Sequence, residues 1–199
     1  MLQLVARRGK SREFQELRDE WEKELEHNPA EHDAWYGYAE LCLLLGREDA
    51  YRRNRTAILD RFGKTTNPVI AERTARACLL IPATGTELEQ AAALAERAVT
   101  LGKQHGYYPY FMAAKALAEY RLGRFESAIE WGGKAEVRGI APMLLVLAMA
   151  HERLGHKEEA RKFLTEALTF YDWNNIEWRR IILPLRHEAA ALLNFDDDR

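Results

Sequence analysis

Apolar residues recur at spacings of three and four along most of the chain, which is the pattern of one buried face of an α-helix. The series begins with Phe14, Leu17, Trp21 and Leu25. Further helices are predicted at 34–45, 47–61, 69–80 and 87–101, and more follow in the second half of the chain. No convincing run of alternating β-branched residues predicts a strand. The pattern therefore predicts an all-α protein of about ten helices.

Two segments in the second half of the chain repeat one another. The same spacing of one glycine and two alanines occurs at Gly123, Ala128 and Ala135 and again at Gly155, Ala160 and Ala167. Each glycine stands between two helical patterns, where a helix end with positive φ is expected. Two helical turns separate the paired alanines, so both lie on one face, where small residues let helices approach closely. The repeat predicts successive helix hairpins.

At these positions the chain resembles the tetratricopeptide repeat, a 34-residue helix–turn–helix unit. Over residues 109–170, the family's motif positions 7, 8, 20, 24 and 27 are matched by Leu147, Ala148, Ala160, Leu164 and Ala167. Over residues 12–105, Trp35 takes position 4 and Gly46 takes the turn. Tyr51 replaces the alanine of position 20 there.

The resemblance implies a single α-solenoid domain, residues 1–195, built from antiparallel helix hairpins. Its units are approximately 1–29, 32–62, 68–103, 109–138 and 141–171, followed by a capping helix at 175–193 and an acidic tail at 196–199. Pro184 is expected to kink or split the capping helix. The segments 70–80 and 186–189 also resemble the repeat regions of bacterial proteins that carry Ser/Thr kinase or WD-repeat domains. That second resemblance implies that the chain is part of a larger signalling protein. The first unit is expected to begin in mid-repeat.

The composition narrows the class of function. The chain has 199 residues, with 29 Lys and Arg against 31 Asp and Glu, and a formal net charge of −2. This balance argues against nucleic acid as a partner, because general polyanion binders are basic. The longest uncharged apolar run, residues 140–150, is shorter than the roughly 20 residues of a membrane-spanning helix, so no membrane segment is predicted. Cys42 and Cys78 lie outside any CxxC pattern, which is typical of a protein in the reducing cytoplasm.

The sequence contains no pattern typical of catalysis, cofactor binding or a metal site. His151 and His156 are five positions apart, whereas two histidines on one helix face share a metal ion at a separation of four. The Gly-Lys step at 133–134 lacks the spacing and the following hydroxyl of a phosphate loop. Neither Ser11 nor Ser127 lies in a GxSxG motif. We therefore expect a non-enzymatic protein without a cofactor or a metal.

The tetratricopeptide resemblance implies that a ligand binds on the inner face of the solenoid, which motif positions 2, 5, 9, 12 and 13 line. Peptide-binding residues are accordingly expected at Tyr36, Glu40, Tyr110, Ala113, Leu117, Tyr120, Arg121, Met149 and Arg153. Tyr110 and Tyr120 would act as aromatic anchors, and Arg121 and Arg153 would bind an acidic group. A packing role between helices is the alternative for leucines such as Leu117. The leading hypothesis is a module that binds a peptide or protein segment.

Two other functions stay open at this point. The predicted helix after Gly46 carries five arginines, which could contact RNA or an acidic protein patch; they are Arg47, Arg52, Arg53, Arg55 and Arg61. The simpler interpretation is a solvated helix face balanced by acidic neighbours. An architectural domain that associates into a homo-oligomer is the second alternative. Salt-dependent RNA binding would favour the first function, and a concentration-dependent solution mass would favour the second.

Overall fold

The computed structural model describes residues 2–134, 140–170 and 176–195. Ten helices lie in these ranges: α1 (Leu2–Glu26), α2 (Asp33–Leu44), α3 (Glu48–Phe62), α4 (Pro68–Leu79), α5 (Gly85–Leu101), α6 (Tyr108–Arg121), α7 (Phe125–Gly132), α8 (Ala141–Arg153), α9 (Lys157–Phe170) and α10 (Ile176–Leu193). The prediction of an all-α protein of about ten helices is therefore confirmed. None of these helices combines the length and the apolar character needed to cross a membrane.

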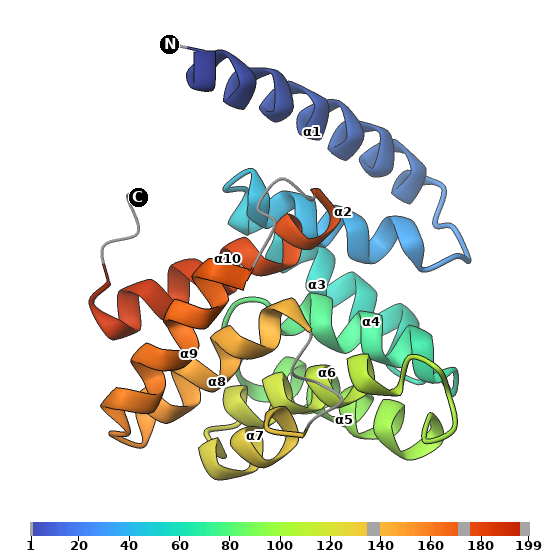
Figure 1. The fold of residues 1–199 in the computed structure, drawn as a ribbon. Coiled ribbons are helices and arrows are strands. Elements are labelled where there is room, and N and C mark those ends of the chain that lie inside the picture. Colours follow the sequence, from blue (N-terminus) through green and yellow to red (C-terminus); the bar gives the residue numbers. More distant parts are fainter. Residues whose placement is uncertain (1, 135–139, 171–175, 196–199) are drawn as a thin grey trace.

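The helices from α2 to α9 pack as consecutive hairpins (Figure 1). We call α2, α4, α6 and α8 the inner row, because each of them contacts the next although a second helix separates them in the chain. The helices α3, α5, α7 and α9 complete the hairpins. These pairs correspond to the predicted units at 32–62, 68–103, 109–138 and 141–171. Contact mainly between neighbouring units is the packing expected of an α-solenoid.

Three of the hairpins turn through the same backbone geometry. Gly46, Gly123 and Gly155 have φ angles of 69°, 76° and 79°, in the left-handed region that favours glycine. In each turn the residue after the glycine donates its backbone N–H to the carbonyl oxygen five residues earlier: Arg47 to Cys42 at 2.7 Å, Arg124 to Glu119 at 2.9 Å and His156 to His151 at 2.9 Å. This is the Schellman arrangement that ends a helix. The glycines predicted as helix stops are therefore confirmed in that role.

The small residues of the repeat are buried between helices. Ala128 and Ala160 are fully buried, and so is Ala91 in the hairpin of α4 and α5. In α3 the equivalent buried place belongs to Tyr51, whose hydroxyl donates to the Ala77 carbonyl oxygen of α4 at 2.8 Å. The tyrosine that departs from the repeat motif thus links the first two hairpins.

The N-terminal segment, the predicted unit at 1–29, contains a single helix instead of two. The structure forms one continuous helix, α1, which packs against α2. Gly9 does not end this helix, because a single glycine in a helix interior costs only about 1 kcal/mol. Phe14 of α1 is buried, and Tyr38 of α2 donates its hydroxyl to Glu22 of α1 at 2.7 Å.

The C-terminal helix takes a different place from the predicted cap. α10 packs against α8 and α9 and also against α2, at the opposite end of the inner row (Figure 1). Ile182, Leu185 and Ala189 are buried, and Pro184 does not split the helix. α10 therefore lies along the inner row instead of covering only the last hairpin. The predicted tail at 196–199 and Ala135 of the repeat lie outside the described residues.

Candidate functional site

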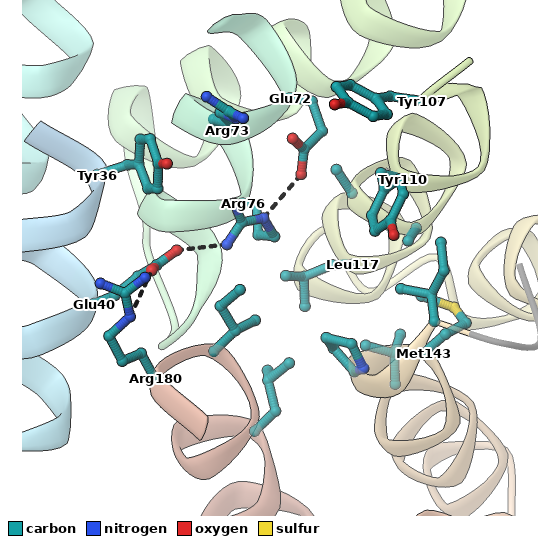
Figure 2. A pocket seen from close by; sticks show the side chains of 17 residues that line it. Tyr36, Glu40, Glu72, Arg73, Arg76, Tyr107, Tyr110, Leu117, Met143 and Arg180 are labelled. Carbon is teal, nitrogen blue, oxygen red and sulfur yellow. Dashed lines mark hydrogen bonds and ion pairs between the residues drawn. The ribbon is translucent and has the colours of Figure 1, made fainter. Parts of the chain in front are cut away.

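A pocket of about 410 Å³ opens on the inner row, between α2, α4, α6, α8 and α10 (Figure 2). Inner helices of successive hairpins stand side by side, so side chains at the same phase of separate helices meet in one place. The lining consists of Tyr36, Glu40, Glu72, Arg73, Arg76, Tyr107, Tyr110, Ala113, Ala114, Leu117, Ile140, Pro142, Met143, Val146, Arg180, Ile181 and Leu185. We call the side contributed by α2, α4 and Arg180 the charged wall, and the side contributed by α6, α8 and the leucine and isoleucine of α10 the apolar wall.

Arg76 is the centre of the charged wall. Its Nη1 donates to Oε1 of Glu40 at 2.5 Å and its Nε donates to Oε1 of Glu72 at 2.8 Å, as the dashed lines in Figure 2 show. Burial opposes the charge on Arg76, but the two carboxylates outweigh this effect and hold its pKa above the ordinary value. Burial raises the pKa of Glu72, and Arg76 partly offsets that rise. The charged arginine therefore ties α2 to α4 at the base of the pocket.

Glu40 and Arg180 form a long ion pair within the charged wall. Glu40 is fully buried, and its Oε2 lies 3.6 Å from Nε of Arg180, an ion pair beyond ordinary hydrogen-bond length. Neither of these two atoms has a hydrogen-bond partner within the part of the chain that the structure describes. The Arg180 guanidinium lies 5.5 Å from the centre of the Trp21 ring, a cation–π contact that holds it at the pocket. Because both atoms are buried and face each other, the pair links α10 to α2 beside the pocket.

Tyr36 is fixed on the charged wall by charged neighbours. Its hydroxyl donates to Oδ1 of Asp33 at 3.1 Å, and Arg73 donates to the same oxygen at 3.0 Å. The guanidinium carbons of Arg73 and Arg76 lie 5.3 Å and 5.9 Å from the centre of the Tyr36 ring. Burial raises the pKa of Tyr36, so its hydroxyl remains a donor at neutral pH. The ring therefore presents a rigid aromatic surface to the pocket.

Two tyrosines form an exposed rim beside the apolar wall. Tyr107 is 52% exposed and Tyr110 is 39% exposed, and their rings meet edge to face with centroids 6.0 Å apart. Among the described residues, the other large apolar side chains with comparable exposure are Leu101 and Phe195. Leu117 lies buried behind the rim. An exposed aromatic pair next to an apolar floor is typical of an interaction surface.

The structure brings together five of the residues expected to bind a peptide. They are Tyr36, Glu40, Tyr110, Ala113 and Leu117, and all of them line the pocket. These residues lie on the same face of the inner helices α2 and α6. The alignment of the repeats predicts which residues lie on that face.

The other four expected residues lie outside the pocket. Met149 is fully buried, and Tyr120 is only 5% exposed. Arg121 forms an ion pair with Glu188 of α10. Arg153 is exposed at the end of α8. Tyr120 and Arg121 thus face α10 instead of an open groove, because α10 folds back along the inner row.

The sequence interpretation missed the residues that α4 and α10 contribute. Glu72, Arg73 and Arg76 could have been found from the phase of the predicted helix at 69–80, because α4 is the inner helix of its hairpin. Tyr107 immediately precedes α6 and belongs to no repeat position. No local pattern places Arg180 at the pocket, because its position depends on where α10 packs.

The arginine-rich helix α3 is largely engaged within the chain. Arg55 is buried, and its Nη2 lies 2.7 Å from Oε2 of Glu87 in α5. Arg52 pairs with the glutamate one turn earlier. Arg61 donates to both the side-chain and the backbone oxygen of Asn28. These contacts favour the interpretation of a helix face balanced by its neighbours and weaken the RNA alternative.

Cys42, Cys78, His151 and His156 do not line the pocket. No group of three or more His, Cys, Asp or Glu side chains in the part of the chain that the structure describes could hold a metal ion. The turn at Gly155 does bring Nδ1 of His151 within 3.2 Å of Nδ1 of His156, because a turn and not a helix joins them. Burial raises the pKa of Cys42 to about 11 and raises that of Cys78 as well, so both thiols stay protonated.

No protein-family model matches the chain, and a comparison with curated proteins finds no match. The geometry of the pocket therefore carries the functional argument. The pocket combines an aromatic rim, an apolar wall, and a charged wall of paired arginines and carboxylates.

Proposed function

We propose that the chain is a non-enzymatic interaction module of tetratricopeptide type, which binds a segment of a partner protein in the inner-row pocket. The exposed pair of Tyr107 and Tyr110 beside the apolar wall is the observation that carries this proposal. Tyrosine supplies a large, stiff contact surface together with a hydroxyl, and it is enriched at the hot spots of protein interfaces.

A polypeptide segment matches both walls of the pocket. An apolar side chain would pack against Leu117, Met143 and Val146. The N–H and carbonyl groups of a neighbouring peptide bond would meet the carboxylates and arginines of the charged wall. A peptide carries both kinds of group in every residue, so an extended or helical segment can satisfy the two walls at once.

The charged wall and its immediate neighbour Asp33 balance in charge. Three arginines and three carboxylates meet there: Arg73, Arg76, Arg180, Asp33, Glu40 and Glu72. Because these charges balance, the wall offers directed hydrogen bonds instead of a field that would attract any polyanion. This favours a partner recognised by shape and hydrogen bonding over a nucleic acid.

Peptides selected from a displayed random library against the whole chain provide a defined ligand for the test. Tyr110→Ala is expected to raise the dissociation constant of a selected peptide about tenfold or more, which corresponds to about 1.4 kcal/mol. Leu101→Ala is the matched control, because Leu101 is 53% exposed on α5 and does not line the pocket. Equal affinity for the unchanged chain and both variants would contradict the pocket as the binding site.

Two further measurements separate the alternative functions. The first is the binding of a labelled single-stranded RNA. Binding that depends strongly on salt, and that disappears when Arg52 and Arg53 are reversed in charge, would favour the RNA alternative. A solution mass that rises with protein concentration would favour self-association. Under the proposed function, neither effect accompanies peptide binding.

A further inference from the structure

Arg121, at the end of α6, holds a carboxylate of the C-terminal helix. Its Nη1 lies 2.5 Å from Oε1 of Glu188 and its Nη2 lies 2.7 Å from Oε2, which makes a two-point ion pair. The Tyr120 hydroxyl also donates to Oε1 of Glu188, at 3.4 Å. The Arg121 side chain is 3% exposed and the Glu188 side chain 23%. Two residues expected to contact a peptide ligand, Tyr120 and Arg121, thus bind an acidic residue of their own chain.

The Arg121 guanidinium is held in place independently of Glu188. Its Nε donates to the Leu79 carbonyl oxygen at 2.8 Å and its Nη2 donates to the Leu80 carbonyl oxygen at 3.0 Å, at the C-terminal end of α4. Carbonyl groups at a helix end lack partners within the helix, so they anchor the arginine there. If Glu188 moved away, the guanidinium would stay as a largely buried cation without a carboxylate. The buried Arg121 guanidinium therefore requires a carboxylate partner, either from Glu188 or from another molecule.

α10 has the form of a helical ligand that lies in a groove. Ile182, Leu185 and Ala189 are buried at spacings of three and four, and Glu188 stands beside them. Pro184 lies within this helix and cannot donate the backbone hydrogen bond of its turn, which weakens the helix by itself. An apolar stripe with an anchoring side chain is how amphipathic helices occupy the grooves of partner proteins.

We propose that the inner row is a helix-binding surface with α10 as its resident occupant. A partner helix that carries the same apolar stripe and a carboxylate at the place of Glu188 exchanges with α10. This inference rests on the proposed function, because the partner uses the same face of the molecule. With α10 docked, Arg180, Ile181 and Leu185 form part of the lining of the pocket. Release of α10 opens the rest of the row, where Arg121 selects for an acidic residue.

A labelled synthetic peptide of residues 176–195 serves as the partner helix in the first test. In the unchanged chain α10 competes with the peptide at the effective concentration of a tethered ligand, about millimolar, so the peptide binds weakly. Glu188→Lys places a cation against Arg121 and releases α10, and the unchanged peptide then binds at least about tenfold more tightly. Glu166→Lys, on an exposed position of α9, is the matched control and binds the peptide like the unchanged chain. A folded Glu188→Lys chain with no gain in affinity overturns the proposal.

Hydrogen exchange of the unchanged chain provides a second test that does not depend on how Glu188→Lys folds. Amides of residues 181–193 are expected to exchange at least about tenfold faster than those of α8, through an opening that leaves α8 closed. If the amides of α10 exchange only in the same opening that exposes the amides of α8, the proposal is overturned. Tyr110→Ala leaves the opening of α10 unchanged. The peptide-affinity measurement therefore tests the pocket, and hydrogen exchange tests the opening of α10. Either proposal can fail without the other.

Discussion

The indole ring of Trp21 in α1 packs directly against the backbone of α2 at Gly37. A Cβ atom added at Gly37 would overlap the six-membered part of that ring. The Arg180 guanidinium of α10 also contacts this ring, 5.5 Å from its centre. One side chain thus joins α1, α2 and α10. Gly37 is required here by close approach and not by an unusual backbone angle.

Gly37→Ala is expected to displace Trp21 and loosen α1. The alanine gains about 1 kcal/mol in helix propensity, but overpacking against the ring costs about 1–3 kcal/mol, so a net loss of stability is expected. Urea unfolding followed by tryptophan fluorescence measures it. Gly106→Ala is the control, because a Cβ there meets nothing within 4 Å. A Gly37→Ala chain as stable as the control would contradict the Trp21 contact.

Ala128→Leu and Ala160→Leu are expected to lower the free energy of unfolding by about 1–3 kcal/mol each, because both alanines are fully buried between helices. Ala50→Leu is expected to cost less, since Ala50 is only half-buried and Tyr51 fills the equivalent buried place. Thermal and urea denaturation compare the three variants. Equal and negligible effects would show that the repeat register is misassigned.

Glu40→Gln is expected to destabilise the chain by about 3 kcal/mol, because it removes the carboxylate that Arg76 and Arg180 share in a buried place. Glu48→Gln is the matched control on the next helix. Its ion pair with Arg52 is about half exposed, so less than about 1 kcal/mol is expected. The difference between the two variants, measured by urea denaturation, isolates the effect of burial. Similar losses for both would mean that the charged wall is solvated.

Two histidines are expected to make the chain less stable toward acid. Burial lowers the pKa of His151 below 6.5, and the neighbouring His156 lowers it further, against an opposing effect of Glu159. Burial also lowers the pKa of His32, against an opposing effect of Asp33. A group whose folded pKa is depressed stabilises the fold above its unfolded pKa, and that stability is lost as the pH falls through the folded pKa.

The thermal midpoint should therefore be lower at about pH 5.5 than at about pH 7.5. His151→Asn removes one of the two titrating groups and should make this difference smaller. The measurement is a pair of calorimetric scans for each protein. A difference that His151→Asn leaves unchanged would contradict the contribution of His151.

The hairpins could be predicted because their determinants are local. A helix stop at Gly123 or Gly155 needs only a residue that tolerates positive φ, and the buried alanines follow it at a fixed distance. The place of α10 could not be predicted in this way. Its apolar stripe fits several surfaces of an α-solenoid, and only long-range packing decides between the last hairpin and the inner row.

The residues of the candidate site could also be predicted only where local spacing determines their position. Tyr36, Glu40 and Leu117 follow from the phase of the inner helices. Arg121, expected to bind an acidic ligand, forms an ion pair with Glu188 of α10. Local spacing indicates what a side chain can bind, whereas the packing of distant segments decides which partner reaches it.

Met143 provides the most direct test of the pocket as the partner-binding site. The chain has four methionines, so a spectrum of ¹³C-labelled methionine methyl groups contains few signals. Both Met143 and Met112 are buried, but Met143 lines the pocket and Met112, on α6, does not. On titration with a library-selected peptide, the Met143 signal should shift to saturation while the Met112 signal stays in place. A saturated complex in which the Met143 signal has not moved would contradict the central claim.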